Sequence, residues 1–247
     1  MTALLSVAGL SKRFDGIAAV SDFDLDLKGG LVTALVGPNG AGKTTIFNLV
    51  TGNLRADTGR ILLEGRPITG LAPHRIARLG IARSFQDLRL FGHMTVRDNV
   101  RAATEPAAWF WQAGGASARR LRQDRVAAAL ERTGLGGLAS ARAIDLAYAE
   151  RKFLSIARII ATGARIWLLD EPASGLDPPS RAHFVGLLRA ATAEGITVCL
   201  IEHNLDIVTE VADRIAFLDE GRKLAEGEPA EILRDKALAA IYFGDRS

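Results

Sequence analysis

The sequence predicts an α/β fold built on a mostly parallel sheet. Three observations support this prediction: an apolar strand runs into a glycine-rich turn and a helix at 31–45, another apolar strand ends in two carboxylates at 166–171, and an Ala- and Arg-rich stretch at about 95–163 has helical periodicity. We expect one domain over the whole chain. Its core, with an antiparallel β-subdomain, comprises residues 1–94 and 164–247, and the helical stretch is an inserted subdomain.

The composition excludes several classes of protein. A chain of 247 residues can bury a sizeable core. It contains no apolar run long enough to span a bilayer, and its start lacks the pattern of a secretory signal, so we expect a cytosolic location. The one cysteine, Cys199, excludes a disulfide framework and a Cys/His metal cage, and its apolar surroundings predict a buried, inert thiol. A net charge of +3 does not suggest nucleic-acid binding.

The opening segment predicts two antiparallel strands, because apolar and polar residues alternate on both sides of a turn at Asp15-Gly16. Phe14 stands just before this turn and has two interpretations. It is either a core residue or a ring that stacks on the adenine of a nucleotide, since a base offers a large π face.

Residues 31–36 form an apolar strand that leads into a phosphate-binding loop and a helix beginning near Lys43. Glycines let successive backbone amides point at one anion, and the helix dipole adds positive potential there. The side chain of Lys43 can reach the β- and γ-phosphates, and the hydroxyl of Thr44 can ligate Mg²⁺. The segment matches the pattern G-x-x-x-x-G-K-[ST] at every position, with the residues Gly37, Pro38, Asn39, Gly40, Ala41, Gly42, Lys43 and Thr44.

The segment after this loop predicts a helix ending at 52–53, a hairpin turning at 64–65 and a short helix closed by Gly80. A further strand then leads to Gln86. This glutamine is either an ordinary turn residue or a ligand of Mg²⁺ or the attacking water, because an amide can both accept and donate hydrogen bonds.

The helical stretch carries two clusters with alternative interpretations. The arginine cluster is either a solvated helix face or a contact with anionic lipid or a partner, and the aromatic cluster either packs the subdomain or marks a partner surface. One apolar helix face is also expected. The arginines are Arg119, Arg120, Arg122 and Arg125; the aromatics are Trp109, Phe110 and Trp111; the apolar face comprises Leu121, Val126, Leu130 and Leu135.

The strand at 166–169 is continuously apolar, which predicts a central parallel strand buried on both faces. Carboxylates at its end would lie in the crevice where α/β sheets bind ligands. We expect Asp170 to hold Mg²⁺ through water and Glu171 to polarise the attacking water. The alternative is a strand followed by two surface acids, which the upstream phosphate loop disfavours.

The rest of the chain predicts a helix at about 180–194, a strand finishing at His203, a helix at 205–214, a hairpin at 214–227 and one short helix at 229–244. His203 is either structural or, because it stands at the end of a core strand, able to reach the γ-phosphate.

These residues together resemble the ATP-binding subunit of ABC transporters over nearly the full length, from Phe14 to the tail around Tyr242. Within that family the chain is most similar to the high-affinity branched-chain amino acid uptake ATPases, on the segments ARSFQ, LAYAE, IEHNLDIV and VADRI, the Trp-containing insertion and the ILRD…YFG ending. The matching motifs are the phosphate loop from Gly37 to Thr45, the Q-loop residue Gln86, the pair Asp170-Glu171, the D-loop Ser174-Gly175-Leu176-Asp177 and the switch histidine His203.

The resemblance implies a mechanism with several partners. Two ATPase subunits, the second one a different chain, would close head to tail around two ATP molecules and Mg²⁺. Each site would combine the phosphate loop of one subunit with the signature loop of the other. Two membrane permeases and an external substrate-binding protein would complete the importer, with this subunit on the cytoplasmic face of the inner membrane. The residues implied in nucleotide contacts across the dimer are Ala147, Tyr148, Ala149, Glu150 and Asp177.

The signature loop departs from the family pattern. The general signature is Leu-Ser-Gly-Gly-Gln and the branched-chain branch often has Leu-Ala-Tyr-Gly-Gln, whereas this chain has Leu146-Ala147-Tyr148-Ala149-Glu150. A Cβ at Ala149 restricts the close approach to phosphate that glycine permits. We therefore expect one of the two composite sites to hydrolyse ATP more slowly than the other.

There are three alternatives to this function: the same ATPase role for another cargo, a soluble ABC ATPase, and a P-loop GTPase. Related systems carry urea, amides or aromatic acids. Soluble ABC ATPases that act on nucleic acid or ribosomes have paired cassettes, coiled coils or zinc insertions, and P-loop GTPases read guanine with Asn-Lys-x-Asp; this sequence has none of these features.

Overall fold

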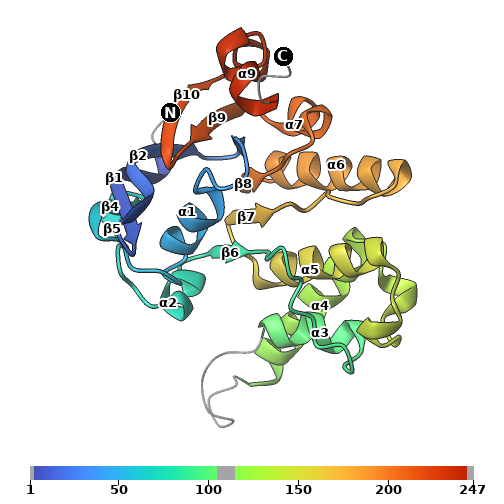
Figure 1. The fold of residues 1–247 in the computed structure, drawn as a ribbon. Helices are drawn as coiled ribbons and strands as arrows, with labels where there is room; N and C mark the ends of the chain where they lie inside the picture. Colours follow the sequence, from blue (N-terminus) through green and yellow to red (C-terminus); the bar gives the residue numbers. More distant parts are fainter. Residues whose placement is uncertain (1–2, 105–114, 244–247) are drawn as a thin grey trace.

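The computed structural model describes residues 3–104 and 115–243 and contains two sheets and a group of helices (Figure 1). The larger sheet is parallel except for the strand at one edge, which confirms the predicted α/β class. In spatial order its strands are β10 (Arg222–Gly227), β9 (Arg214–Asp219), β3 (Val32–Val36), β8 (Thr197–Ile201), β7 (Ile166–Asp170) and β6 (Ile81–Arg83).

The inner strands of the larger sheet are buried on both faces, as their continuous apolar sequences predict. Alternate residues along β7 belong to different cores: Trp167 and Leu169 to one, Ile166 and Leu168 to the other. Cys199 on β8 is buried, and burial raises the pKa of its thiol. The sheet therefore lies between two hydrophobic cores, and the packing on both faces fixes where the loops at its edge begin.

The smaller sheet is antiparallel, with the strand order β2-β1-β4-β5. The predicted turns are confirmed: Asp15 and Glu64, the first residues of two turns, have positive φ of 44° and 50°. Its strands are β1 (Ala3–Phe14), β2 (Ile17–Lys28), β4 (Thr58–Leu63) and β5 (Arg66–Pro67).

Among the described residues outside the helical stretch and the C-terminal tail, four helices directly precede or follow strands of the larger sheet in the sequence. The helix predicted at about 180–194 begins two residues earlier, because the Asp177 side chain accepts a hydrogen bond from Ser180 N and two prolines fit the first turn. The helices are α1 (Lys43–Val50), α2 (Pro73–Arg78), α6 (Pro178–Ala193) and α7 (Leu205–Val211).

The stretch predicted to be helical contains α3, α4 and α5, which pack against one another on one side of the sheet (Figure 1). One detail of the prediction is wrong: Leu121 is exposed, whereas Val126 and Leu130 are buried. Five residues turn a helix by about 500°, so Leu121 lies well off the face that Val126 occupies. The elements are α3 (Val96–Thr104), α4 (Ala116–Arg132), the 3₁₀ turns Gly136–Leu138 and Ala143–Asp145, and α5 (Tyr148–Thr162).

The aromatic cluster Trp109-Phe110-Trp111 lies outside the described residues. Among residues 3–104 and 115–243, no helix is both long and apolar enough to cross a membrane. The division into a core and a helical subdomain stays a prediction.

The C-terminal segment forms two helices instead of the one predicted, α8 (Pro229–Ile232) and α9 (Lys236–Phe243). The Asp235 side chain accepts hydrogen bonds from the amides of Ala237 and Leu238, which starts a new helix. The tail therefore turns back, and α9 lies beside β9 at the top of Figure 1.

Candidate active site

Four loops meet at the carboxyl edge of the larger sheet, where α/β sheets bind ligands. They follow β3, β6, β7 and β8, and these strands are neighbours in the sheet. Between them lies a cleft of about 690 Å³, lined by Ala19, Asn39, Gly40, Ala41, Gly42, Lys43, Thr44, Thr45, Gln86, Glu171, Ile201 and His203. The fold thus brings the predicted phosphate loop together with three of the predicted catalytic and metal-binding side chains.

The phosphate loop keeps its shape because two of its glycines have no room for a side chain. Gly37 has a φ of 153°, and an added Cβ would overlap the Leu218 carbonyl oxygen. Gly42 has a φ of 92°, and an added Cβ would overlap the carbonyl oxygen of Ala19. The loop is therefore clamped by β9 on one side and by β2 on the other.

Lys43 is the buried cation of the cleft. Its Nζ donates hydrogen bonds to the carbonyl oxygens of Gly37 and Pro38, each at 2.7 Å. Burial lowers the pKa of Lys43, and the negative charges of Glu171 and Asp170 oppose this shift. The ammonium is held at the loop by weak neutral acceptors, and a phosphate oxygen is a stronger acceptor for it.

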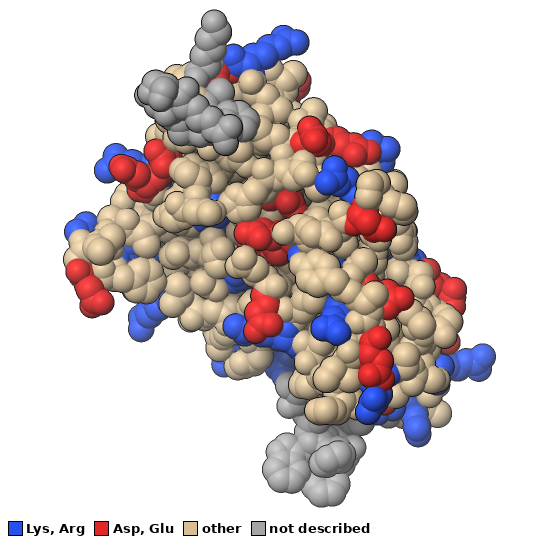
Figure 2. All heavy atoms as spheres, turned by 45° about the vertical axis from the view of Figure 1, so that its right-hand side comes forward, with Lys and Arg blue, Asp and Glu red and all other residues tan. Residues whose placement is uncertain are grey.

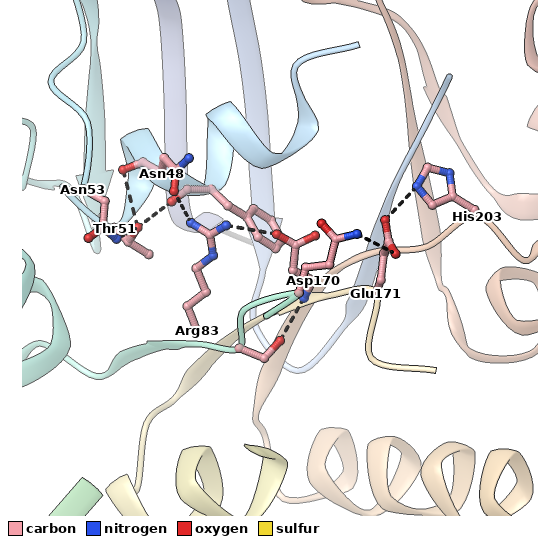
Figure 3. Close-up of polar contacts among 10 residues, drawn as sticks. Asn48, Thr51, Asn53, Arg83, Asp170, Glu171 and His203 are labelled. Carbon is pink, nitrogen blue, oxygen red and sulfur yellow. Dashed lines mark hydrogen bonds and ion pairs between the residues drawn. The ribbon is translucent and has the colours of Figure 1, made fainter. Parts of the chain in front are cut away.

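Asp170 ends β7, and its side chain is only 2% exposed. Its Oδ2 lies 3.0 Å from Arg83 Nη2, and Arg83 Nη1 donates to Asn48 Oδ1 at 2.6 Å (Figure 3). Burial raises the pKa of Asp170, while the hydrogen bond and charge of Arg83 oppose the rise. The Ser84 hydroxyl accepts from Asp170 N at 2.9 Å, so Arg83 holds the carboxylate and the next residue, Ser84, holds the main chain of Asp170.

Glu171 points into the cleft from a backbone conformation that few residues adopt, with a φ of 46°. Its Oε1 lies 3.1 Å from His203 Nε2, and its Oε2 lies 3.4 Å from Gln86 Nε2 (Figure 3 labels Glu171 and His203). Lys152 Nζ donates to the main-chain oxygen of Glu171 at 2.6 Å. Strain of this kind is typical of functional residues, and here it aims a carboxylate between two polar groups.

Outside the signature loop, four predicted nucleotide contacts do not line the cleft: Gly37 and Pro38 at the start of the phosphate loop, Phe14 and Asp177. Phe14 is 43% exposed at the β1–β2 turn, with Lys12 Nζ 5.5 Å from its ring centroid. Asp177 caps α6 by accepting from Ser180 N at 3.2 Å. Their contacts with nucleotide stay predictions.

The signature loop opens α5 and also lies outside the cleft lining. Glu150 Oε2 accepts from Ala147 N at 2.7 Å, so this side chain caps its own helix. The Tyr148 hydroxyl donates to Ser174 O at 3.3 Å. Within one chain, the signature loop therefore contacts the D-loop.

Three buried charged residues of this region were not identified from the sequence: Arg83, Lys152 and Glu202. Burial raises the pKa of Glu202, and its Oε1 accepts from Ala173 N at 2.8 Å. Each stands within or directly beside an apolar strand or helix face, and such a position is the sequence signal that predicts a paired charge.

Known sequences resemble this chain over its length. The family described as ABC transporter matches residues 20–174. The high-affinity branched-chain amino acid transport ATP-binding protein LivG of Escherichia coli (strain K12) is 39% identical, covering 98% of both chains. The corresponding protein BraF of Pseudomonas aeruginosa is 37% identical, with the same coverage.

Solved structures give the same result for the fold. A nucleotide-free ATP-binding cassette from an ABC transporter superposes with a TM-score of 0.88 at 28% identity, covering 99% of this chain and 100% of that one. The ADP conformation of MJ1267, an ATP-binding cassette of an ABC transporter, gives a TM-score of 0.87 with the same identity and coverage. The predicted fold class is thereby confirmed.

Proposed function

Because this chain belongs to the ABC transporter family, as an ATP-hydrolysing subunit, we propose that it powers the import of branched-chain or other hydrophobic amino acids. The observation that carries the ATPase role is the cleft that joins a full phosphate loop to Glu171 and His203. Support for the amino acid class comes from the names of LivG and BraF. Urea, amides and aromatic acids are the alternative cargoes.

We assign ATP binding to the loop Gly37–Thr45. Its backbone amides and the N-terminus of α1 converge where the triphosphate would lie, and Lys43 would leave the carbonyls of Gly37 and Pro38 for phosphate oxygens. Phe14 would stack on the adenine. The partner's ATP would contact the signature loop 147–150 together with Asp177.

The proposed Mg²⁺ ligands are Thr44, Gln86 and, through water, Asp170. They offer hydroxyl, amide and carboxylate oxygens, which are the donors this hard cation prefers. The buried ion pair with Arg83 holds the Asp170 side chain in one orientation beneath the cleft. When bound, the metal would neutralise charge on the phosphates.

Glu171 would polarise the attacking water, with His203 and Gln86 as its neighbours. The carboxylate already accepts from both side chains, at 3.1 Å and 3.4 Å. A water between Glu171 and the γ-phosphate would give its proton toward the carboxylate as its oxygen attacks. His203 would then contact the γ-phosphate.

The proposed assembly comprises this subunit, a second and different ATPase chain, two membrane permeases and an external substrate-binding protein. It would lie on the cytoplasmic face of the inner membrane, attached through the permeases. On the face drawn in Figure 2, acidic and basic side chains of the described residues are interspersed, so this face has no basic patch of the kind that binds nucleic acid.

Two variants test the ATPase mechanism in the assembled transporter. Glu171→Gln keeps the phosphate cradle but loses the base, so we expect ATP binding within about twofold of the parent and turnover at least about 100-fold lower. Lys43→Ala removes the ammonium, so we expect ATP affinity to fall by about tenfold or more. Labelled-ATP binding and phosphate release measure the two quantities.

The matched control is Glu194→Gln; Glu194 is an exposed carboxylate at the C-terminal end of α6 that pairs with Arg132 at the end of α4. It should leave both quantities at parent values. Hydrolysis by Glu171→Gln at the parent rate would refute the assignment of this carboxylate.

A further inference from the structure

One side chain of the C-terminal helix contacts the main chain of an active-site residue. The Tyr242 hydroxyl, on the last turn of α9, donates to the main-chain oxygen of His203 at 2.5 Å. His203 lies in the short link between the end of β8 and Asn204, which caps α7. A residue about forty positions away thus holds the backbone of the residue that contacts Glu171.

The same peptide is held on its other side by a buried carboxylate. Glu202 is only 2% exposed; burial raises the pKa of its carboxyl, and the nearby backbone amides of Ala173, His203 and Asn204 oppose the rise. Its Oε1 also accepts from Ala173 N at 2.8 Å, two residues after Glu171. Glu202 therefore connects the link between β8 and α7 to Ala173, in the loop that follows Glu171, and Tyr242 connects the same link to the C-terminal helix.

The packing of α9 determines where the Tyr242 hydroxyl lies. Leu238, one helical turn earlier, is buried, and the Tyr242 ring meets Phe217 edge-on with centroids 6.3 Å apart. Phe217 on β9 pairs with Val36, the residue before the phosphate loop. Tyr242 therefore rests on the strand that supports the phosphate loop while its hydroxyl holds the His203 carbonyl.

We propose that Tyr242 is a positioning residue that sets the His203 side chain against Glu171 through this main-chain contact. The inference rests on the proposed function. One hydrogen bond from the tail limits rotation of the His203 peptide, and the imidazole keeps its 3.1 Å contact with Glu171 Oε1. The tail of this subunit is then a part of its catalytic geometry.

Tyr242→Phe removes only the hydroxyl and leaves the ring on Phe217. In the assembled transporter we expect kcat for ATP to fall about fivefold while KM stays within about twofold, because the ATP-binding loop is untouched. In a His203→Ala background the same substitution should change kcat by less than about 1.5-fold, since residues that act through one another are not additive. Equal losses in both backgrounds would overturn the proposal.

Hydrogen exchange of the purified full chain gives a readout independent of hydrolysis. We expect peptides covering 202–208 to exchange about tenfold faster in Tyr242→Phe, because the tie on the His203 carbonyl is lost. The matched control is Thr209→Val, which removes a hydroxyl that donates to Leu205 O on α7. It should leave kcat and exchange at Glu202 and His203 unchanged.

The two measurements separate the two hypotheses. An assembly that released no phosphate would refute the proposed function, and exchange would then decide the Tyr242 contact alone. Parent-like exchange in Tyr242→Phe would overturn the positioning role even in a fully active transporter.

Discussion

The side chain of Arg83 is almost completely buried, although the sequence assigned no role to this residue. Its guanidinium lies 5.4 Å from the Phe47 ring centroid and 4.9 Å from that of Phe85, and it pairs with Asp170 where both side chains are almost inaccessible. Removing one partner of such a pair leaves an uncompensated buried charge. Among the ion pairs that the described residues form, we therefore expect the Arg83–Asp170 pair to cost the most stability when one partner is removed.

Arg83→Gln should lower the free energy of unfolding by about 3 kcal/mol, because Asp170 would lose its buried cation. Chemical denaturation of the full chain measures this change. Arg165→Gln is the matched control, since its partner Glu64 is half-exposed and solvent already screens the pair. Equal effects of the two substitutions would show that the Arg83 pair is no more important than a surface contact.

At the residue scale, the sequence predicted the site residues that belong to a short motif or end a strand. It missed the residues whose role depends on a partner far away in the sequence. Lys43, Thr44, Glu171 and His203 line one cleft, as the phosphate-loop motif predicts for the first two and the position after a strand predicts for the last two. The Arg83 pair joins β6 to β7, whose ranges are separated by more than eighty residues. No spacing rule connects such partners, because only the folded sheet makes them neighbours.

At the scale of elements, α5 carries the departure from the family signature. Ala149 lies in the first turn of this helix, where ordinary helical angles suit any residue, so the backbone conformation does not require glycine. The relevant effect of its Cβ is the space it occupies at the helix start. The Glu150 carboxylate caps the same turn through Ala147 N.

Ala149→Gly should raise ATP turnover of the assembled transporter by about twofold or more, because a methyl group is removed where the partner's phosphate would approach. Ala128→Gly on the exposed side of α4 is the control for the helix-propensity cost of about 1 kcal/mol. An unchanged rate in Ala149→Gly would remove the idea that this loop makes one site slow.

Element boundaries were predicted best where a glycine marks a turn, as at Gly52 and Gly65, which both have positive φ. The helix after the phosphate loop and the hairpin at 64–65 lie where expected. The start of α6 was missed because Pro178 and Pro179 resemble a break, although proline suits a first turn. The tail was read as one helix because its interruption depends on Asp235, whose capping role is visible only in the fold.

At the scale of the whole molecule, the arrangement of sites implies dependence on other chains. The cleft holds the phosphate loop, whereas the signature loop lies outside it and contacts the D-loop instead. The composite site that we propose would combine this cleft with the signature loop of a second cassette.

The full chain, tagged and expressed in its own cell, should therefore co-purify from detergent-solubilised membranes with two permease chains and a second, different ATPase chain. Quantitative mass spectrometry should give equal amounts of the two ATPases, because head-to-tail closure pairs one with the other. Glu171→Gln is the matched control, since it alters a side chain in the cleft and should recover the same chains in the same ratio. Two copies of this chain in place of a second ATPase would refute the heterodimer, and with it the origin proposed for unequal sites. Recovery with ribosomes and without permeases would refute the transport role.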